Sequence, residues 1–164
     1  MPMEYTIARA IEQDKKDILA LYKAQIGREF CPWDDNYPSE ETIEFDMSRD
    51  ALFVMKEDGV IKAAISIDDD EEVEKLECWS RELKPVRELS RLAVATDAQN
   101  RGLARIMLRY AMDELRKMGC KGVHFLVNKY NIKAIRSYEV LDFNIVGECY
   151  MHDQDYYCYE KELL

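Results

Sequence analysis

Hydrophobic residues near the start of the chain change from a strand-like to a helix-like spacing. Residues 5–9 alternate between apolar and polar side chains, which predicts a short strand. Residues 12–23 repeat apolar positions at helical intervals, which predicts a helix. We expect the buried face of this helix to hold Ile18, Leu19 and Tyr22.

A segment rich in turn formers, residues 27–38, separates this helix from a second one that runs to about residue 49. Ser39 stands just before the second helix and belongs to the preferred N-cap residues. Thr42 occupies the third helical position, where a capping box has Glu or Gln. We therefore expect Ser39 to act as a plain N-cap.

Two apolar, β-branched runs follow, at residues 52–56 and 60–67. The residues between them, Glu57-Asp58-Gly59, are typical of a tight hairpin. An acidic run at residues 68–72 comes next, and it lacks the glycine and the twelve-residue spacing of a calcium loop. We expect this run to be the solvated end of a hairpin.

Residues 86–94 form the next predicted strand, and a polar turn leads from it into an amphipathic helix that ends before Gly119. The apolar stripe of this helix consists of Ala104, Met107, Leu108, Ala111, Leu115 and Met118. Alternation in the strand puts Glu88, Ser90, Leu92 and Val94 on one side, and Leu89, Arg91 and Ala93 on the other.

The remaining pattern predicts a strand at 123–127, a helix at 131–141 and two closing strands at 144–149 and 156–160. Neither a repeat nor a linker interrupts the chain. We therefore expect a single domain over residues 1–164, of mixed α/β (α+β) class, with a largely antiparallel sheet flanked by helices.

Composition narrows the class of protein. The chain has 164 residues, is 48% hydrophobic, and has no apolar run near the roughly 18 residues that a membrane span needs. Its N-terminal residues lack a basic flank and an apolar signal core, so we expect a cytosolic protein without membrane partners. The formal charge of −10 repels phosphate backbones and argues against nucleic acid as a partner.

Five cysteines and two histidines are scattered along the chain without Cys-x-x-Cys pairs or histidine doublets. This spacing suggests neither a disulfide framework nor a metal site. We expect reduced thiols that mostly serve packing.

The most informative stretch joins the strand at 86–94 to the helix after it. An apolar strand breaks at a polar turn, Gly102 allows close approach of the backbone, and the helix begins with unpaired N–H groups. Such N–H groups and the helix dipole bind phosphate, and the arginines at 101 and 105 can assist with their side chains. A structural turn also explains this pattern in many unrelated proteins.

This stretch resembles the signature of the GNAT family of acyl-CoA-dependent N-acetyltransferases, Gln or Arg followed by x-x-Gly-x-Gly or Ala. Gln99, Gly102 and Ala104 match it. Asn131 and the run from Ala134 to Phe143 resemble the family's asparagine and its Ala-x-x-x-Tyr-x-x-x-Gly-Phe segment. Asp142 replaces the usual glycine of that segment, and Asp tolerates a left-handed backbone better than most residues.

The resemblance implies a splayed sheet and acetyl-CoA as donor. Its pyrophosphate would lie on the turn at residues 101–105, and its pantetheine beside the strand that ends at Val94. The implied cofactor-binding residues are Leu92, Ala93, Val94, Gln99, Asn100, Arg101, Gly102, Leu103, Ala104, Arg105, Asn131 and Ala134.

Amine acetylation needs a neutral amine and a proton for the departing thiolate. The resemblance implies that Tyr138 is the acid, and the alternative is a tyrosine packed on a helix face. The resemblance also makes Glu88 the candidate base, because some members carry a glutamate in this strand that acts through a water, which Ser90 on the same face could position. The alternative is a strand carboxylate paired with Arg87 or Arg91. The N–H of Val94 can polarise the thioester oxygen if the strand is bulged there.

Trp33 and Tyr37 are candidates for the wall of an acceptor pocket that suits a cationic amine, and they could equally be packing anchors of their loop. We expect an N-acetyltransferase that acts on a primary amine of a small molecule or peptide by direct attack. A non-catalytic acyl-CoA-binding module is the alternative, and a homodimer is left open.

Overall fold

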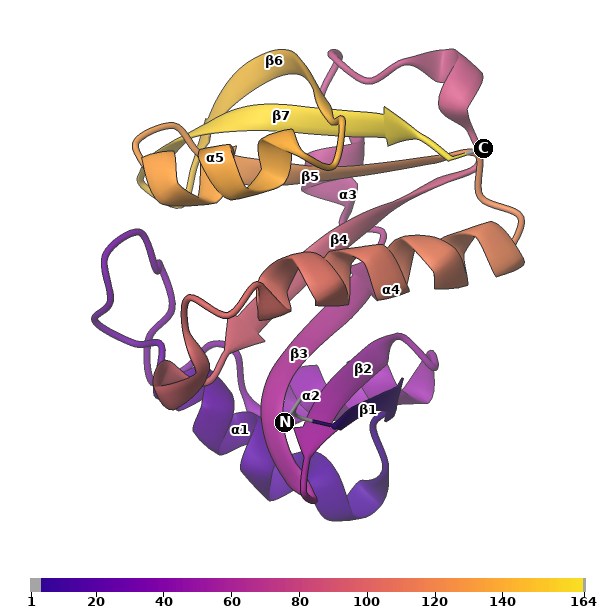
Figure 1. Cartoon of the computed structure of the whole chain (residues 1–164). Helices are drawn as coiled ribbons and strands as arrows, with labels where there is room; N and C mark the ends of the chain where they lie inside the picture. Colours follow the sequence, from indigo (N-terminus) through magenta and orange to yellow (C-terminus); the bar gives the residue numbers. More distant parts are fainter. Residues whose placement is uncertain (1–3, 164) are drawn as a thin grey trace. The chain divides into compact units, whose positions relative to one another are not determined.

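The structure is a computed structural model that describes residues 4–163 (Figure 1). Its strands hydrogen-bond in the order β1-β2-β3-β4-β5-β7-β6. The β4–β5 pair is parallel and its ladder comprises three residue pairs, from Val86↔Gly122 to Glu88↔His124. The pairs β1–β2, β2–β3, β5–β7 and β6–β7 are antiparallel. This mixed, mostly antiparallel sheet with helices confirms the predicted fold class.

The elements have the following bounds. The strands are β1 (Tyr5–Arg9), β2 (Leu52–Glu57), β3 (Val60–Asp68), β4 (Val86–Val94), β5 (Gly122–Asn128), β6 (Asn144–Met151) and β7 (Gln154–Glu162). The α-helices are α1 (Lys15–Lys23), α2 (Glu40–Ser48), α3 (Glu71–Glu74), α4 (Leu103–Lys117) and α5 (Ile132–Glu139), with 3₁₀ turns η1 (Glu12–Asp14), η2 (Arg81–Leu83) and η3 (Thr96–Ala98).

The chain divides into two compact units, each of which is described by itself. The first unit comprises the residues up to Ile67 together with Ser90–Ala111, and the second comprises Asp68–Leu89 together with the residues from Met112 onward. A single domain over the whole chain stays a prediction. No helix among residues 4–163 is long and apolar enough to cross a membrane.

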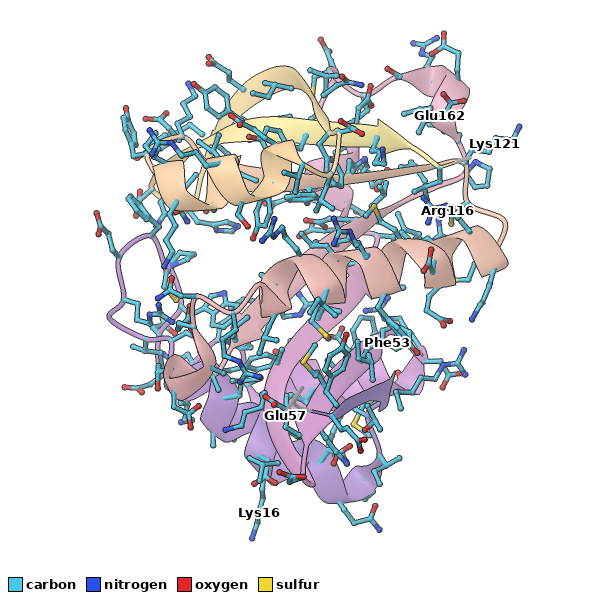
Figure 2. All side chains as sticks on the ribbon, in the orientation of Figure 1. Lys16, Phe53, Glu57, Arg116, Lys121 and Glu162 are labelled. Atoms are coloured by element: carbon cyan, nitrogen blue, oxygen red, sulfur yellow. The ribbon has the colours of Figure 1, made fainter. Side chains whose placement is uncertain are left out.

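The core of the first unit lies between helices α1 and α2 and one face of the β2–β3 hairpin. Phe53 points to the other face of β2 and meets Tyr110 of α4 edge-on, with ring centroids 5.5 Å apart (Figure 2). Leu21 rather than Leu19 joins Ile18 and Tyr22 on the buried face of α1. The buried face is therefore turned slightly about the helix axis from the one predicted. The core cluster contains Ile18, Leu21, Tyr22, Ile43, Leu52, Val54, Ile61, Ala64 and Ala93.

Local signals set the ends of these elements. The β2–β3 turn has Asp58 at φ 50° and Gly59 at φ 80°, as a two-residue type I′ hairpin requires. The prediction of a plain N-cap at Ser39 was wrong. The backbone N–H of Thr42 donates to Ser39 Oγ (3.3 Å), and the Ser39 N–H donates to Thr42 Oγ1 (3.1 Å). A threonine hydroxyl therefore closes the capping box in place of Glu or Gln.

The second unit is built on the β5-β7-β6 sheet, which carries different layers on its two faces. The Phe125 ring of β5 meets Tyr138 of α5, Phe143 and Tyr159 edge-on, at centroid distances of 4.7–5.7 Å. His124, the preceding residue of β5, faces the opposite side and meets Glu74 of α3 there. Helices α5 and α3 accordingly cover opposite faces of this sheet (Figure 1).

Two further expectations need correction in this unit. The acidic run is solvated, but it is not a hairpin end, because its last residues begin helix α3, which Asp70 caps through a bond from the Glu72 N–H (2.9 Å). Met118 is 57% exposed and leaves the apolar stripe of α4. Just after β7, the Leu163 N–H donates to the Lys121 carbonyl (2.7 Å), next to Glu162, the last residue of that strand (Figure 2).

Residues 75–84, here called the strap, lie on the α3 side of the sheet. Trp79 stacks on the His124 ring, with centroids 4.1 Å apart and planes 20° apart, and its indole N–H donates to the Val73 carbonyl. The backbone N–H of Ser80 donates to Glu160 of β7 (2.9 Å), and the Ser80 hydroxyl donates to the same carboxylate. These contacts bury His124 completely.

The burial of His124 predicts a dependence of stability on pH. Burial lowers the pKa of His124 from 6.5 to about 4 and also raises the pKa of Glu74, whose Oε1 lies 3.0 Å from Nε2. Because the folded pKa of His124 lies below its unfolded pKa, the unfolded chain binds the proton more readily between pH 6.5 and 4. This contribution to stability is present above pH 6.5 and is lost as the pH falls towards 4.

We expect the wild type to lose about 3 kcal/mol of unfolding free energy over this pH range relative to His124→Phe, which keeps a ring under Trp79 but cannot titrate. Urea unfolding of both proteins at pH 7, 5.5 and 4 measures the difference. Parallel pH profiles would contradict a neutral buried imidazole. The other histidine, His152, is exposed in both proteins.

Candidate active site

The turn between β4 and α4 lies within the first unit and contains the predicted phosphate-binding residues. Asn100 and Gly102 both have left-handed backbones, with φ of 64° and 76°. The Ile106 N–H donates to the Gly102 carbonyl (3.2 Å). The N–H groups of the first helical turn, at Leu103, Ala104 and Arg105, have no carbonyl partner within the helix, because hydrogen bonding inside the helix begins one turn later. The positive end of a helix of 15 residues is thus formed at this turn.

The amide of Gln99 acts on the protein's own backbone. Its Nε2 donates to the Val94 carbonyl (2.7 Å), and Gln25 Nε2, from just beyond α1, donates to the same carbonyl (3.0 Å). Gln99 thereby closes the turn back onto the end of β4. The sequence analysis missed Gln25, because its partner lies 69 residues away and no local pattern marks it.

The two arginines of the turn have different surroundings. Arg101 forms a two-fold pair with Glu57 of β2, with Nη1–Oε1 and Nη2–Oε2 both 2.8 Å. The hydrogen bond with Arg101 lowers the pKa of Glu57 and raises the pKa of Arg101. Arg105 instead folds over Gly102, where its Nη2 lies 3.6 Å from the position that a Cβ would occupy. Arg101 therefore ties the turn to β2, and Arg105 is the arginine whose side chain lies over the turn.

The strand before the turn is distorted at Arg91, whose φ is 48°. A left-handed residue inside a strand interrupts the regular pleat, as β-bulges do. Ala93 is buried in the first unit's core, whereas Ser90, Leu92 and Val94 are half-buried.

A buried carboxylate holds this distorted residue. Asp46 of α2 is fully buried and accepts from Arg91 Nε (3.0 Å to Oδ2) and Arg91 Nη2 (3.0 Å to Oδ1). Arg49 Nη2 (2.7 Å) and Ser66 Oγ (2.8 Å) donate to the same carboxylate. Sequence reasoning missed Asp46, because its main partner lies 45 residues further along the chain.

The two predicted acceptor residues lie in the same unit. Arg91 Nη1 donates to the Tyr37 hydroxyl (2.9 Å), and Tyr37 is 45% exposed. The Trp33 ring meets Tyr22 edge-on, with centroids 5.3 Å apart, and packs against the core cluster. Trp33 thus anchors the loop, and Tyr37 links the loop to β4. A role for either in binding an acceptor stays a prediction.

The second unit holds Tyr138, Asn131 and Ala134. Tyr138 is half-buried on α5, and burial raises its pKa to about 12. Asn131 is the N-cap of α5, with its Oδ1 accepting from the Ala134 N–H (3.1 Å). Asp142, at φ 59°, adopts the left-handed backbone that was expected where the family's segment has glycine.

Glu88, also in the second unit, is buried on β4 beside His124 of β5. Paired residues of parallel strands point to the same face, so Glu88 lies on the His124 face and Tyr138 lies on the Phe125 face. The two candidate proton-transfer groups therefore belong to opposite faces of the sheet. On the Glu88 face a cavity of about 420 Å³ is lined by Glu74, Leu76, Glu77, Trp79, Ser80, Arg81, Lys84, Val86, His124 and Glu160.

The sequence profile of the acetyltransferase (GNAT) family matches residues 18–143. No curated protein matches the sequence. Among solved structures, the ribosomal-protein-S18-alanine N-acetyltransferase of Escherichia coli is 22% identical, with a TM-score of 0.73, over 98% of this chain and 94% of that chain.

A putative acetyltransferase of Salmonella typhimurium, solved with its cofactor acetyl-CoA, is 20% identical, with a TM-score of 0.77, over 98% of this chain and 94% of that chain. The ribosomal-protein-alanine N-acetyltransferase of Brucella melitensis is 19% identical, with a TM-score of 0.78, over 96% of this chain and 99% of that chain. At these identities the likeness shows a shared fold.

The Asp46 cluster generates a prediction on stability. Asp46→Asn removes the buried charge that two guanidinium groups face, and we expect it to lower the unfolding free energy by about 3 kcal/mol. Asp50→Asn is the matched control, because the Asp50–Arg9 pair is 3.9 Å long and both side chains are at least 60% exposed. The control is expected to cost less than about 1 kcal/mol. Equal losses in urea unfolding would refute the importance of the buried carboxylate.

Proposed function

The chain belongs to the GNAT family of acetyltransferases, whose donor is acetyl-CoA, and from this premise we propose that it acetylates a primary amine of a small molecule or peptide by direct attack. The observation that carries the proposal is the β4–α4 turn, where Gly102 has a left-handed backbone, Arg105 lies over it and the first N–H groups of α4 follow. A diphosphate fits such a turn, because backbone N–H groups, the helix dipole and one guanidinium all favour negative charge.

The roles within the donor site divide between backbone and side chains. We assign the diphosphate to the N–H groups of residues 101–105 and to the Arg105 side chain. Arg101 and Gln99 keep the turn in shape through Glu57 and Val94. Leu92, Ala93 and Val94 supply the strand beside which the pantetheine would run, and the Val94 N–H is assigned to the thioester oxygen. Asn131 and Ala134 are proposed to contact the donor from the start of α5.

Tyr138 is proposed as the general acid. The thiolate that leaves after acetyl transfer needs a proton, and a phenol with a pKa of about 12 still carries its proton at neutral and mildly alkaline pH. Burial thus keeps Tyr138 in the form that can donate.

Glu88 is proposed as the general base, acting through a water that Ser90 positions. The amine nitrogen attacks the thioester carbon only after it has lost its ammonium proton, which the carboxylate accepts through that water.

The acceptor is proposed to be cationic, since the net charge of −10 steers cations to the protein. Two of the structural neighbours act on an alanine of a ribosomal protein, which is in keeping with a peptide amine among the classes to test. A screen of polyamines, aminoglycosides and peptide amines, read by release of free CoA, tests the proposal. Binding of CoA without release on any amine would favour a non-catalytic binding module.

Gly102 offers a test of the diphosphate turn with a matched control. Gly102→Ala forces a left-handed alanine, which costs about 1–2 kcal/mol and shifts the N–H groups. We expect at least a tenfold rise in the Kd for CoA by titration calorimetry, equivalent to about 1.4 kcal/mol. Gly59→Ala imposes the same strain at φ 80° in the β2–β3 turn and should leave the Kd unchanged. Unaltered affinity in Gly102→Ala would count against the turn.

Tyr138→Phe is expected to lower kcat by about 100-fold or more, with the KM for acetyl-CoA within about twofold of wild type, because the ring still packs on Phe125. Tyr159→Phe removes a hydroxyl from the same aromatic group and should keep most of the activity. Since the pKa of Tyr138 is about 12, kcat of the wild type should not fall between pH 7 and 10 through loss of this proton. An unchanged kcat in Tyr138→Phe would remove the acid role.

A further inference from the structure

Three of the five cysteines meet on the strap side of the second unit. Cys78 belongs to the strap, Cys149 to β6 and Cys158 to β7. Cys158 is fully buried, and both Cys78 and Cys149 are within hydrogen-bonding contact of its thiol. Cys78 and Cys149 are only half-buried. Neither the diphosphate turn nor the proposed acid and base involves these thiols.

Cys78 packs directly against Gly147, which has no side chain. A Cβ at Gly147 would lie 2.6 Å from Cys78 Cβ and 3.2 Å from Cys78 Sγ, so the strap cysteine occupies the space that any side chain at 147 would need. Gly147 is the cross-strand partner of Cys158. Directly opposed Cβ positions in an antiparallel pair lie about 4.5–5.5 Å apart. Because Cys78 lies where the Gly147 side chain would be, it is a direct neighbour of Cys158.

The third thiol is less suitably placed for a bond with Cys158. Cys149 pairs with Tyr156, so Cys149 and Cys158 are diagonal neighbours on adjacent strands. Diagonal positions lie about 7–8 Å apart, whereas a disulfide needs Cβ atoms about 3.5–4.5 Å apart. Strand pairing holds both Cys149 and Cys158 in this register, whereas Cys78 lies in the strap, outside any strand.

We propose that Cys78 and Cys158 form an intrachain disulfide by exchange with a small-molecule disulfide, which fastens the strap to β7. The Cys78 thiolate, on the more accessible side, attacks one sulfur of the small disulfide and releases the first small thiol. Cys158 then attacks Cys78 Sγ and passes its proton to the departing sulfur, which leaves as the second small thiol. The two cysteines lose two electrons and two protons, and the small disulfide is reduced to two thiols.

The surroundings support oxidation of thiols rather than capture of a metal. No group of three or more His, Cys, Asp or Glu side chains among residues 4–163 is arranged to hold a metal ion. Burial raises the pKa of Cys158 and so disfavours its thiolate, which leaves the half-buried Cys78 as the first nucleophile. The bond would enclose a long loop and add a covalent tie to the Trp79–His124 stack and the Ser80–Glu160 hydrogen bonds.

The test uses the full chain incubated with oxidised glutathione. Thiol titration is expected to fall from five to three, and non-reducing peptide mapping by mass spectrometry is expected to find Cys78 linked to Cys158. The melting temperature should rise by about 5 °C or more and return on reduction. Five remaining thiols, a lasting glutathione adduct, or a Cys149–Cys158 link in the wild type would each overturn the proposal.

Variants separate the strap thiol from the others. Cys149→Ser and Cys120→Ser should retain the linked peptide and the rise in melting temperature, since neither supplies a bonding sulfur. Cys78→Ser should lose both. The mapping of the wild type decides the matter even if Cys78→Ser folds poorly, and none of these measurements depends on acetyltransferase activity.

Discussion

The first unit depends on one buried charge, the Asp46 carboxylate. A carboxylate without water is costly unless hydrogen bonds and opposite charge compensate it, and here Arg91, Arg49 and Ser66 all donate to it. Arg91 is the left-handed residue of β4, so the carboxylate fixes the place where the strand departs from regular geometry. The end of β4, the hydrogen bond from Gln99 to the Val94 carbonyl and the turn at Gly102 all come after Arg91 along the chain.

The parts of the fold that rest on local signals could be predicted from the sequence. The hairpin at Asp58–Gly59, the apolar stripe of α4 and the turn at Gly102 each depend on residues within a few positions of one another. Prediction from local sequence failed at two helix N-termini, where a side chain caps the helix in a way that was not predicted. Thr42 completes a capping box with a hydroxyl, and Asp70 caps a short helix inside an acidic run.

The rest of the candidate site could not be predicted, because its partners are remote in sequence. Arg101 looks like a phosphate ligand when read alone, and only the position of Glu57 on β2 shows that its guanidinium is held by the protein. Arg91 is likewise defined by Asp46. Tyr138 and Glu88 were identified through the family resemblance, and their separation onto two faces of the sheet follows from strand register, which no single-residue pattern contains.

The Val94 carbonyl at the end of β4 limits how a ligand can hydrogen-bond to this strand. A carbonyl oxygen has two lone pairs, and at Val94 the amides of Gln25 and Gln99 occupy both. This oxygen is saturated as an acceptor. An amide N–H of any molecule that lies along the strand has to find its acceptor at a different carbonyl, so two glutamines set the register in which such a molecule can lie.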